Sequence, residues 1–279
     1  MTNLPSINQS KDEDFLSNLW SYFDAHGRHE LPWRLPEPDG TFDPYKILVS
    51  ELMLQQTQVA RVIPKFLTFL ELFPTVQTLA AASLGDVLIA WSGLGYNRRA
   101  KFLYQAAQRI VTDLKGEFPS TQAELVGLPG VGPNTAGAIL AYAFNQPTVF
   151  IETNVRTVYI HQYFSDRTNI PDTDLRPIIE RTLDVQRPRL FYWALMDYGS
   201  HLKQTVGNLN KLSSHYTKQS PFADSLRRVR GQVIRLLAKR IYTHQELESE
   251  ITDNRLSIVL DALVAEEMIT KSKDNYRLA

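Results

Sequence analysis

The sequence contains no cysteine among its 279 residues. A chain without thiols forms no disulfide, has no thiolate nucleophile and cannot hold zinc or an iron–sulfur cluster through cysteine ligands. Long apolar runs are also missing, since no stretch approaches the roughly 18–20 residues that a membrane-spanning helix needs. The first residues, "MTNLPSINQSKDEDF", are polar and unlike a secretory signal. We therefore expect a protein without membrane contacts, located in the cytoplasm, or associated with the nucleoid if bacterial.

The sequence also lacks net charge, with 30 basic and 30 acidic residues. Proteins that bind nucleic acids are usually basic, so the overall charge argues mildly against such a partner. The distribution is uneven, however, because residues 225–240 hold six basic residues and no acidic one. This cluster fits a solvated helix face as well as it fits a nucleic-acid contact.

Strand-like alternation is scarce, and apolar residues recur mostly at helical spacing, which predicts an all-α fold. The predicted helices span residues 12–26, 45–58, 60–73, 84–92, 98–114, 122–127, 134–144, 154–164, 174–183 and 190–203. Residues 203–222 are polar, contain glycine and proline, and are predicted to form a connector.

The last 55 residues form a separate pattern of three predicted helices, 226–240, 243–251 and 254–268, followed by a short extended end. This order is typical of a small winged-helix-like module. Its third helix carries Asp261, Glu266 and Glu267. Acidic side chains there favour packing over reading of a DNA groove.

The segment "LPGVGPNTAGAIL", residues 128–140, predicts a tight glycine turn in front of a helix. Gly130 and Gly132 allow positive φ and close approach of a ligand to the backbone. Pro133 suits the first turn of the helix that follows. The N–H groups of that turn can bind a phosphate without any basic side chain. The alternative is a purely structural hairpin between two helices.

Two glutamates are candidates for acid–base chemistry. Glu51 lies in the apolar helix pattern "YKILVSELML", where a carboxyl group tends to hold its proton and can act as a general acid. The alternative is a solvated or paired glutamate at the helix edge. Glu152 follows the apolar run 149–151; either it or Thr153 could simply cap the next helix.

Several motifs in this order, "LPWR", "DPYKILVSELMLQQTQV", "WSGLGYNRRAKFL", "LPGVGPNTAGAIL" and "ETNVRTV", resemble the adenine DNA glycosylases of the A/G-mismatch (MutY) type. These enzymes belong to the helix-hairpin-helix base-excision superfamily, together with endonuclease III-like enzymes. The resemblance covers roughly residues 15–199. It implies a glycosylase domain over residues 1–222, with a six-helix subdomain at about 43–150, a second subdomain from 1–42 and 151–222, and a central cleft. Residues 223–279 would form the winged-helix-like module.

The resemblance also implies roles for individual residues. Glu51 matches the glutamate that protonates the departing adenine and handles the water. Glu152 occupies the place of the second carboxylate, with Asn154 nearby. Residues that enter the duplex or touch the opposite base are matched by Leu54, Gln55, Gln56 and Thr57. Tyr96 matches an aromatic residue wedged beside the opposite base, the alternative being a packed aromatic side chain.

In the hairpin, the resemblance implies contacts with a DNA phosphate from Gly130, Val131, Gly132, Pro133 and Asn134. The backbone carbonyls of Val126, Leu128 and Val131 would face a monovalent cation, Na⁺ or K⁺, with a structural role. No cofactor is required by this interpretation.

The sequence departs from the family pattern in several places. The family's second carboxylate is an aspartate, whereas this chain has Glu152, and a shift of about 1 Å can cost roughly a hundredfold in rate. The iron–sulfur cysteines are absent, and we find no counterpart of the 8-oxoguanine-sensing C-terminal domain. The position of the Schiff-base lysine of bifunctional relatives is Asn134.

We therefore expect a monofunctional DNA glycosylase that removes adenine opposite guanine or 8-oxoguanine in base excision repair. It would act as a monomer on double-stranded DNA with a mismatch or damaged base. One alternative is a thymine or uracil glycosylase acting on mismatches with guanine. Another is a catalytically weak protein that binds DNA structures.

Overall fold

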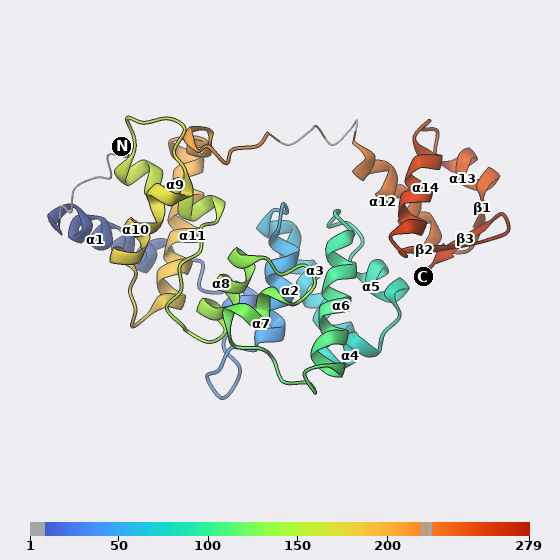
Figure 1. Ribbon diagram of the computed structural model, residues 1–279, viewed down its shortest axis with the longest axis horizontal. Coiled ribbons are helices and arrows are strands. Elements are labelled where there is room, and N and C mark those ends of the chain that lie inside the picture. Colours follow the sequence, from blue (N-terminus) through green and yellow to red (C-terminus); the bar gives the residue numbers. More distant parts are fainter. Residues whose placement is uncertain (1–8, 219–220, 222–224) are drawn as a thin grey trace. The chain divides into compact units, whose positions relative to one another are not determined.

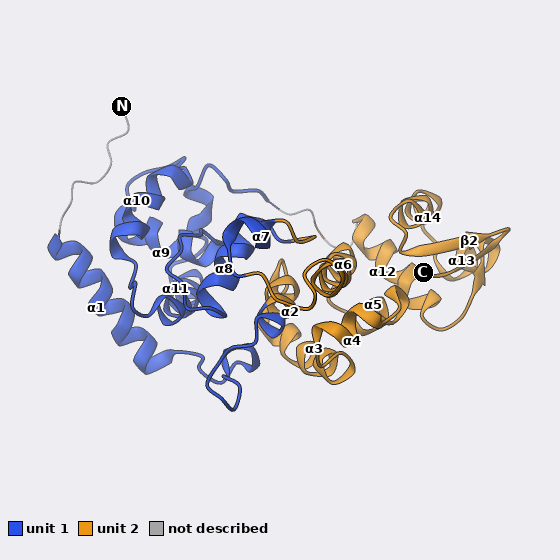
Figure 2. Ribbon diagram, turned by 60° about the horizontal axis from the view of Figure 1, so that its bottom comes forward, with its two compact units in different colours: residues 1–47, 120–126, 131–218 blue, residues 48–119, 127–130, 219–279 orange. Residues whose placement is uncertain are grey.

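The structure is a computed structural model that describes residues 9–218, 221 and 225–279. The chain forms two compact units, coloured in Figure 2. Unit 1 contains residues 1–47, 120–126 and 131–218, and unit 2 contains residues 48–119, 127–130 and 219–279. The chain therefore passes from one unit to the other several times.

Unit 1 is built from helices that pack around α11, which lies along α9 and α1 (Figure 1). Its helices are α1 (Gln9–His26), α7 (Gln122–Val126), α8 (Pro133–Tyr142), α9 (Thr153–Tyr163), α10 (Asp172–Thr182) and α11 (Pro188–Thr205), with short 3₁₀ turns at Pro32–Arg34 and Leu209–Leu212. Phe15 and Leu19 of α1 are buried and Phe15 meets the ring of Tyr159 edge-on at 5.4 Å, so the apolar stripe predicted in the first helix forms core.

The "LPWR" motif is fixed to unit 1 by a buried ion pair. Arg34 donates two hydrogen bonds to the carboxylate of Asp197 in α11, at 2.7 and 3.0 Å, and Arg28 pairs with the same carboxylate. Burial raises the pKa of Asp197, but the bonds and charge of Arg34 outweigh it and hold that pKa below its usual value. The pair joins the chain before α2 to the centre of the unit.

The first part of unit 2 is a set of helices. It starts within α2 (Pro44–Leu54), whose first residues belong to unit 1. Its further helices are α3 (Val59–Leu72), α4 (Val76–Ala81), α5 (Leu84–Ala90) and α6 (Arg98–Thr112). The sequence analysis missed α4, which is too short for a periodic pattern and begins with a capping box formed by Thr75 and Thr78. It also placed the end of α2 too late, because Gln56 adopts φ +57° and leaves the helix.

The second part of unit 2 is the predicted winged-helix-like module, which the structure confirms. It consists of α12 (Leu226–Leu237), β1 (Tyr242–Thr243), α13 (His244–Glu250), α14 (Leu256–Ala265), β2 (Ile269–Ser272) and β3 (Asn275–Leu278). The strands form an antiparallel sheet in the order β1-β3-β2. The fold is therefore helical except for this small sheet, as the sequence predicts. Throughout the described ranges, each helix is too short or too polar to cross a bilayer.

Candidate active site

Glu51 lies in the last turns of α2, within unit 2. Its helix neighbours Leu48, Leu52 and Met53 are fully buried, whereas Glu51 itself is half-buried. The apolar surroundings expected from the sequence are therefore present along this helix. From such a position a carboxyl group borders both the protein interior and the surface, as a general acid must. Its role as the acid stays a prediction.

The loop that follows α2 is held by a residue that the sequence analysis missed. Arg99 of α6 is buried, and its guanidinium donates hydrogen bonds to the carbonyls of Leu52 at 2.7 Å, Met53 at 2.9 Å and Gln55. These are carbonyls that the end of a helix leaves without backbone partners. Arg99 therefore caps α2 and supports the turn at Gln56.

The same guanidinium reaches a second loop. Arg99 donates to the hydroxyl of Thr57 at 3.1 Å and to the carbonyls of Leu94 and Gly95 at 3.3 and 3.1 Å. It also lies 5.4 Å from the ring centroid of Tyr96. Burial lowers the pKa of Arg99 to about 10, so it remains charged near neutral pH. One side chain thus joins the predicted duplex-entering loop, residues 55–57, to the loop of the predicted wedge. The signal that could have revealed it is the pair "RR" after "GLGYN".

Tyr96 occupies the left-handed region, with φ +49°. It follows Gly93 and Gly95, which also have positive φ, so the chain turns sharply before α6. A bulky residue seldom adopts this conformation, and here the surrounding contacts enforce it. Tyr96 is half-buried. Its ring therefore packs partly on the protein, and its place beside an opposite base stays a prediction.

The glycine turn between α7 and α8 has the predicted backbone. Gly130 has φ +77°, and a Cβ atom there would lie 2.6 Å from the Cβ of Phe102. Gly132 has an extended conformation, and among the described residues beyond its chain neighbours no atom lies within 4 Å of the place where its Cβ would be. Pro133 stands in the first turn of α8, as predicted. Gly130 is therefore required by conformation and packing, whereas the backbone at Gly132 is open to a ligand.

Asn134 has a contact that the sequence did not reveal. Its side-chain amide donates to the carbonyl of Ile151 at 3.0 Å, and its carbonyl oxygen accepts from the N–H of Ile151 at 3.3 Å. This paired bond ties the first turn of α8 to the residue directly before Glu152. Asn134 thus positions the backbone from which Glu152 projects.

Glu152 stands at the N-cap position of α9 but, among the described residues, makes no capping hydrogen bond with its side chain. The simple capping role considered above is therefore wrong. Burial raises the pKa of Glu152 to about 7, and the nearby Arg156 opposes this rise. The charge of Arg156 is shared with Asp172, to which it donates two bonds of 2.7 Å. Glu152 is consequently a carboxyl group that titrates near neutral pH.

The first turn of α9 is held from two sides within unit 1. Asn154 donates to the carbonyl of Met196 in α11 at 3.2 Å, and a Cβ at Gly199 would come within 2.5 Å of the Asn154 carbonyl oxygen. On the other side, Asn210 donates to the hydroxyl of Thr157 at 2.6 Å. Asn154 therefore fixes how α9 lies on α11, next to Glu152.

Asn210 belongs to the region where relatives are expected to have cluster cysteines. In this chain the region holds a short 3₁₀ turn, and Ile170 exchanges backbone hydrogen bonds with Leu212 and Ser214 at 2.9 and 3.0 Å. Over residues 9–218, 221 and 225–279, the structure contains no group of three or more acidic or histidine side chains that could hold a metal ion. Hydrogen bonds hold the described part of this segment.

The two candidate carboxyl groups belong to different units, Glu51 to unit 2 and Glu152 to unit 1. That they face one another across a cleft stays a prediction.

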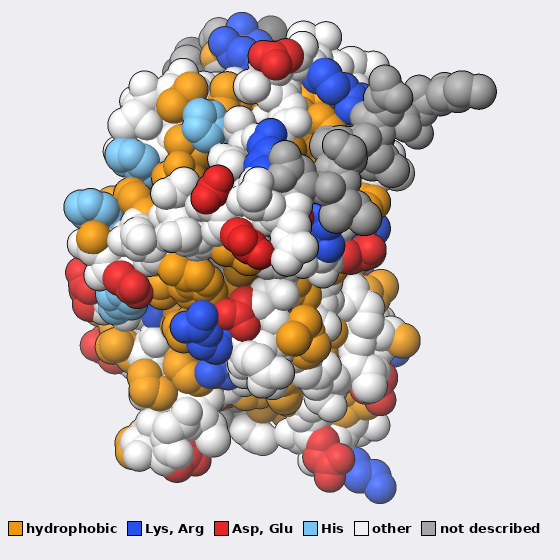
Figure 3. Space-filling model, turned by 90° about the vertical axis from the view of Figure 1, so that its left-hand side faces the viewer, with side chains coloured by type: hydrophobic (Ala, Val, Ile, Leu, Met, Phe, Trp, Pro, Cys, Tyr) orange, Lys and Arg blue, Asp and Glu red, His pale blue; other side chains and the backbone are white. Residues whose placement is uncertain are grey.

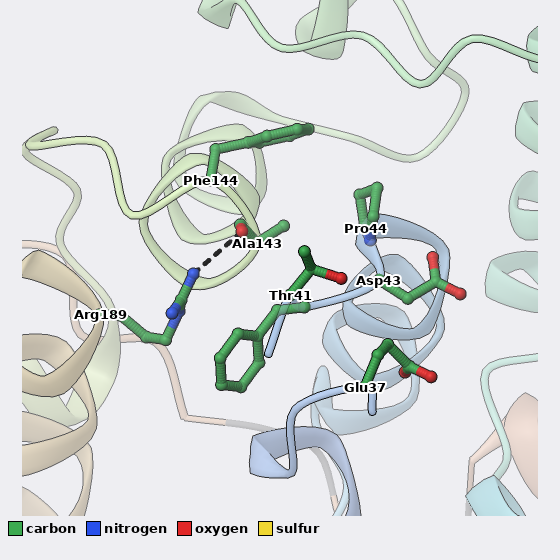
Figure 4. A pocket seen from close by; sticks show the side chains of 8 residues that line it. Glu37, Thr41, Asp43, Pro44, Ala143, Phe144 and Arg189 are labelled. Atoms are coloured by element: carbon green, nitrogen blue, oxygen red, sulfur yellow. Dashed lines mark hydrogen bonds between the residues drawn. The ribbon is translucent and has the colours of Figure 1, made fainter. Parts of the chain in front are cut away.

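A pocket of 630 Å³ lies elsewhere in unit 1, beside the N-terminus of α2 (Figure 4). It is lined by Glu37, Thr41, Phe42, Asp43, Pro44, Ala143, Phe144 and Arg189. Arg189 donates to the carbonyl of Ala143 at 3.0 Å and therefore caps the C-terminus of α8. Its guanidinium also lies 3.8 Å from the ring centroid of Phe42. None of the predicted site residues lines this pocket.

On the face drawn in Figure 3, basic and acidic side chains are interspersed.

Residues 49–181 match the family model described as "HhH-GPD superfamily base excision DNA repair protein". This segment contains every predicted site residue from Glu51 to Asn154. This part of the chain, just under half of its length, is therefore similar to that superfamily.

Within that class, the chain is similar to curated proteins named adenine DNA glycosylase. It is 36% identical over 190 residues to that of Buchnera aphidicola subsp. Baizongia pistaciae, covering 67% of this chain and 52% of the relative. The identity is 39% over 227 residues for the Mus musculus protein, with 78% and 43% covered, and 42% over 140 residues for that of Mycolicibacterium smegmatis, with 50% and 46% covered. The chain thus spans about half the length of these relatives.

Solved structures show the same fold. A thermostable thymine-DNA glycosylase superimposes with a TM-score of 0.61 at 24% identity, covering 75% of this chain and 97% of that one. A non-covalent endonuclease III–DNA complex gives a TM-score of 0.53 at 20% identity, with 78% and 92% covered. At these identities the likeness establishes the fold alone.

Proposed function

We propose that the protein is a monofunctional DNA glycosylase of base excision repair that flips out adenine mispaired with guanine or 8-oxoguanine and hydrolyses its N-glycosyl bond. One observation carries the proposal. The segment that matches the superfamily holds both candidate carboxyl groups, and the relatives at 36–42% identity are named adenine DNA glycosylases.

The residues suit this chemistry. Breaking the N-glycosyl bond leaves electron density on the base and positive charge on the sugar, so an acid must act at the base and an anion near the anomeric carbon. Glu51 would give its proton to the departing adenine. Water then adds its hydroxyl to the anomeric carbon and would give its remaining proton back to the Glu51 carboxylate. Glu152 would stabilise the sugar cation in its ionised form, which its pKa of about 7 makes available at neutral and alkaline pH.

The product would be an intact abasic site. A strand-cleaving relative needs an amine to form a Schiff base with the sugar. The matching position is Asn134, whose amide is bonded to the backbone of Ile151. An amide in this place positions Glu152 but is no nucleophile.

The DNA would be bound by the hairpin without a basic surface. The open backbone at Gly132 and the first turn of α8 present N–H groups suited to a phosphate. A Na⁺ or K⁺ ion at the carbonyls of Val126, Leu128 and Val131 would add positive charge at this phosphate. The protein would work as a monomer on mismatched double-stranded DNA, inside the cell, without an iron–sulfur cluster, because no cysteine is available to hold one.

The test is incubation of the purified protein with duplexes that contain A·8-oxoG, A·G, T·G or U·G, followed by alkali to cleave abasic sites. We expect cleavage at adenine in the first two duplexes and an uncut strand before alkali. Cleavage confined to thymine or uracil, or no cleavage at enzyme excess, would contradict the proposal.

Glu51→Gln should lower the single-turnover rate by about a thousandfold or more while leaving duplex affinity near that of the wild type, because the amide cannot donate the proton. The matched control is Glu71→Gln, an exposed glutamate of α3, which should cleave normally. A Glu51→Gln variant with near wild-type rate would remove Glu51 from the acid role.

A further inference from the structure

The winged-helix-like module, residues 225–279, is docked on the N-terminus of α6 by the acidic end of its third helix. The carboxylate of Glu266, directly after α14, pairs with Arg98 of α6 at 2.6 Å and with Arg230 of α12 at 2.5 Å. The carbonyl of Glu266 accepts a 2.6 Å hydrogen bond from Lys101, which also pairs with Glu267. Two of the acidic residues that argued against DNA reading by this helix, Glu266 and Glu267, therefore pair with basic residues of α6. Through Arg230, Glu266 also holds α12.

The beginning of α12 meets the loop of Tyr96. Arg227, the second residue of the helix, donates a hydrogen bond to the Tyr96 hydroxyl, and its guanidinium lies 5.0 Å from the centroid of the ring. The next arginines face carboxylates of the module itself, Arg228 at Asp253 and Arg230 at Glu266. Arg227 is thus the arginine of this turn that reaches the aromatic side chain of the α6 loop.

Tyr96 consequently lies against two guanidinium groups from different parts of unit 2. Arg99 of α6 stands 5.4 Å from its ring centroid and Arg227 of α12 stands 5.0 Å away. A cation over a tyrosine ring is attracted by the negative face of the ring, and a hydrogen bond from a charged donor is stronger than one between neutral groups. Of these two guanidinium groups, that of Arg227 belongs to the module.

We propose that Arg227 is a specificity-determining positioning residue, through which the winged-helix-like module holds Tyr96 beside the base opposite the excised one. This inference rests on the proposed function, because Tyr96 meets that base only if the protein acts on mismatched DNA. Arg227 acts through Tyr96 and has no part in breaking the N-glycosyl bond. The module then contributes to opposite-base selection by its first helix rather than by placing its third helix in a groove.

The test compares wild type, Arg227→Gln, Tyr96→Ala and the double variant, with Arg235→Gln as the control. Arg235 is an exposed arginine of the same helix, so its replacement changes the charge equally. Two readouts are used: the ratio of single-turnover rates on A·G and A·C duplexes, and the fluorescence of 2-aminopurine placed opposite the target adenine. Stacking of Tyr96 on this probe quenches it whether or not the adenine is excised.

Arg227→Gln should lower the selectivity ratio about tenfold, as expected for loss of a charged hydrogen bond. It should also relieve most of the quenching, as Tyr96→Ala does, and the double variant should be no worse than Tyr96→Ala. Arg235→Gln should match the wild type in both readouts, and thermal unfolding should show that both arginine variants remain folded at the assay temperature. Wild-type quenching and selectivity in Arg227→Gln, or additive effects in the double variant, would overturn the inference. A wild-type protein that quenches the probe but cleaves no duplex would instead overturn the proposed function.

Discussion

Glu152 shows how one side chain acquires a property that its sequence context does not display. The sequence offered a choice between a helix cap and a catalytic carboxylate. In the folded chain the side chain makes no capping bond among the described residues, and its pKa rises to about 7 because burial outweighs the charge of Arg156. Burial depends on neighbours that are remote in the chain, so no local pattern could predict it.

The raised pKa of Glu152 has a consequence for stability. The unfolded chain ionises this group near 4.5 and the folded protein near 7, so unfolding becomes easier as pH rises through this window. Between pH 5 and pH 8 the free energy of unfolding of the wild type should fall because of this group. In Glu152→Gln this fall should be smaller by about 1–3 kcal/mol. Urea unfolding at both pH values measures this.

Glu180→Gln, which alters an exposed glutamate of α10, serves as the control and should follow the wild type at both pH values. In cleavage assays, Glu152→Gln should be slow at every pH, whereas the wild-type rate should rise with pH up to about 7 as the carboxylate forms. Equal pH dependence of unfolding in wild type and Glu152→Gln would show that the group titrates normally in the folded protein.

Asn134 and Asn154 have structural contacts that could not be predicted from their positions in the sequence. Both were predicted from the resemblance as site residues, and the structure gives them definite work: Asn134 holds Ile151, and Asn154 holds Met196. Neither contact has a signal in the sequence, because each partner is a backbone group on another element. Their predicted contacts with DNA and with the catalytic carboxylate stay predictions.

At the scale of the elements, Arg99 is the residue on which two loops depend. Its guanidinium caps the end of α2 and bonds to the loop of Tyr96. Lysine has a single ammonium group and cannot reach both sets of carbonyls. We expect Arg99→Lys to lower the free energy of unfolding by about 2–4 kcal/mol and the cleavage rate by at least about tenfold. Chemical denaturation and single-turnover kinetics measure the two effects.

Arg61→Lys, at an exposed site of α3, is the matched control for unfolding and should be neutral. If Arg99→Lys proved as stable and as active as the wild type, the two loops would have to be held by their own backbones.

Most helices could be predicted, because an amphipathic pattern several turns long reports burial directly. The errors were at short elements and at ends. α4 is six residues long and β1 is two, too short for any period to appear. The end of α2 depends on Arg99, which lies far along the chain. Of the candidate site, the hairpin backbone was predictable because glycine permits positive φ and proline fixes φ near the helical value.

At the scale of the molecule, the carboxylate of Glu266 is one of the groups that join the winged-helix-like module to α6. Burial raises the pKa of Glu266. Its hydrogen bonds with Arg98 and Arg230 have the larger effect together and bring this pKa below its usual value. Its stabilising contribution is therefore full at neutral pH and is lost in acid, as the carboxylate gains a proton. We expect Glu266→Gln to destabilise the protein by about 1–3 kcal/mol at pH 7.

The local measurement is hydrogen exchange, which should become faster in α12 and at the start of α6. Glu250→Gln, at an exposed glutamate ending α13, should leave exchange unchanged. The variant should also lose the opposite-base selectivity assigned to Arg227, because α12 would no longer hold that arginine at Tyr96. Unaltered exchange in Glu266→Gln would mean that the other contacts, such as the bond from Lys101 to the Glu266 carbonyl, dock the module without this carboxylate.

The sequence by itself determined most of the helical segments, where the glycine turn lies, that this chain has no thiolate chemistry and which family the motifs resemble. These follow from local rules: the period of apolar residues, the φ angles open to glycine and proline, and the kinds of side chain present. Only the tertiary structure decided that Arg99 joins two loops, that Glu152 titrates near neutrality and that Arg227 meets Tyr96. Those properties arise from desolvation and from contacts between residues distant in the chain, which no local pattern encodes.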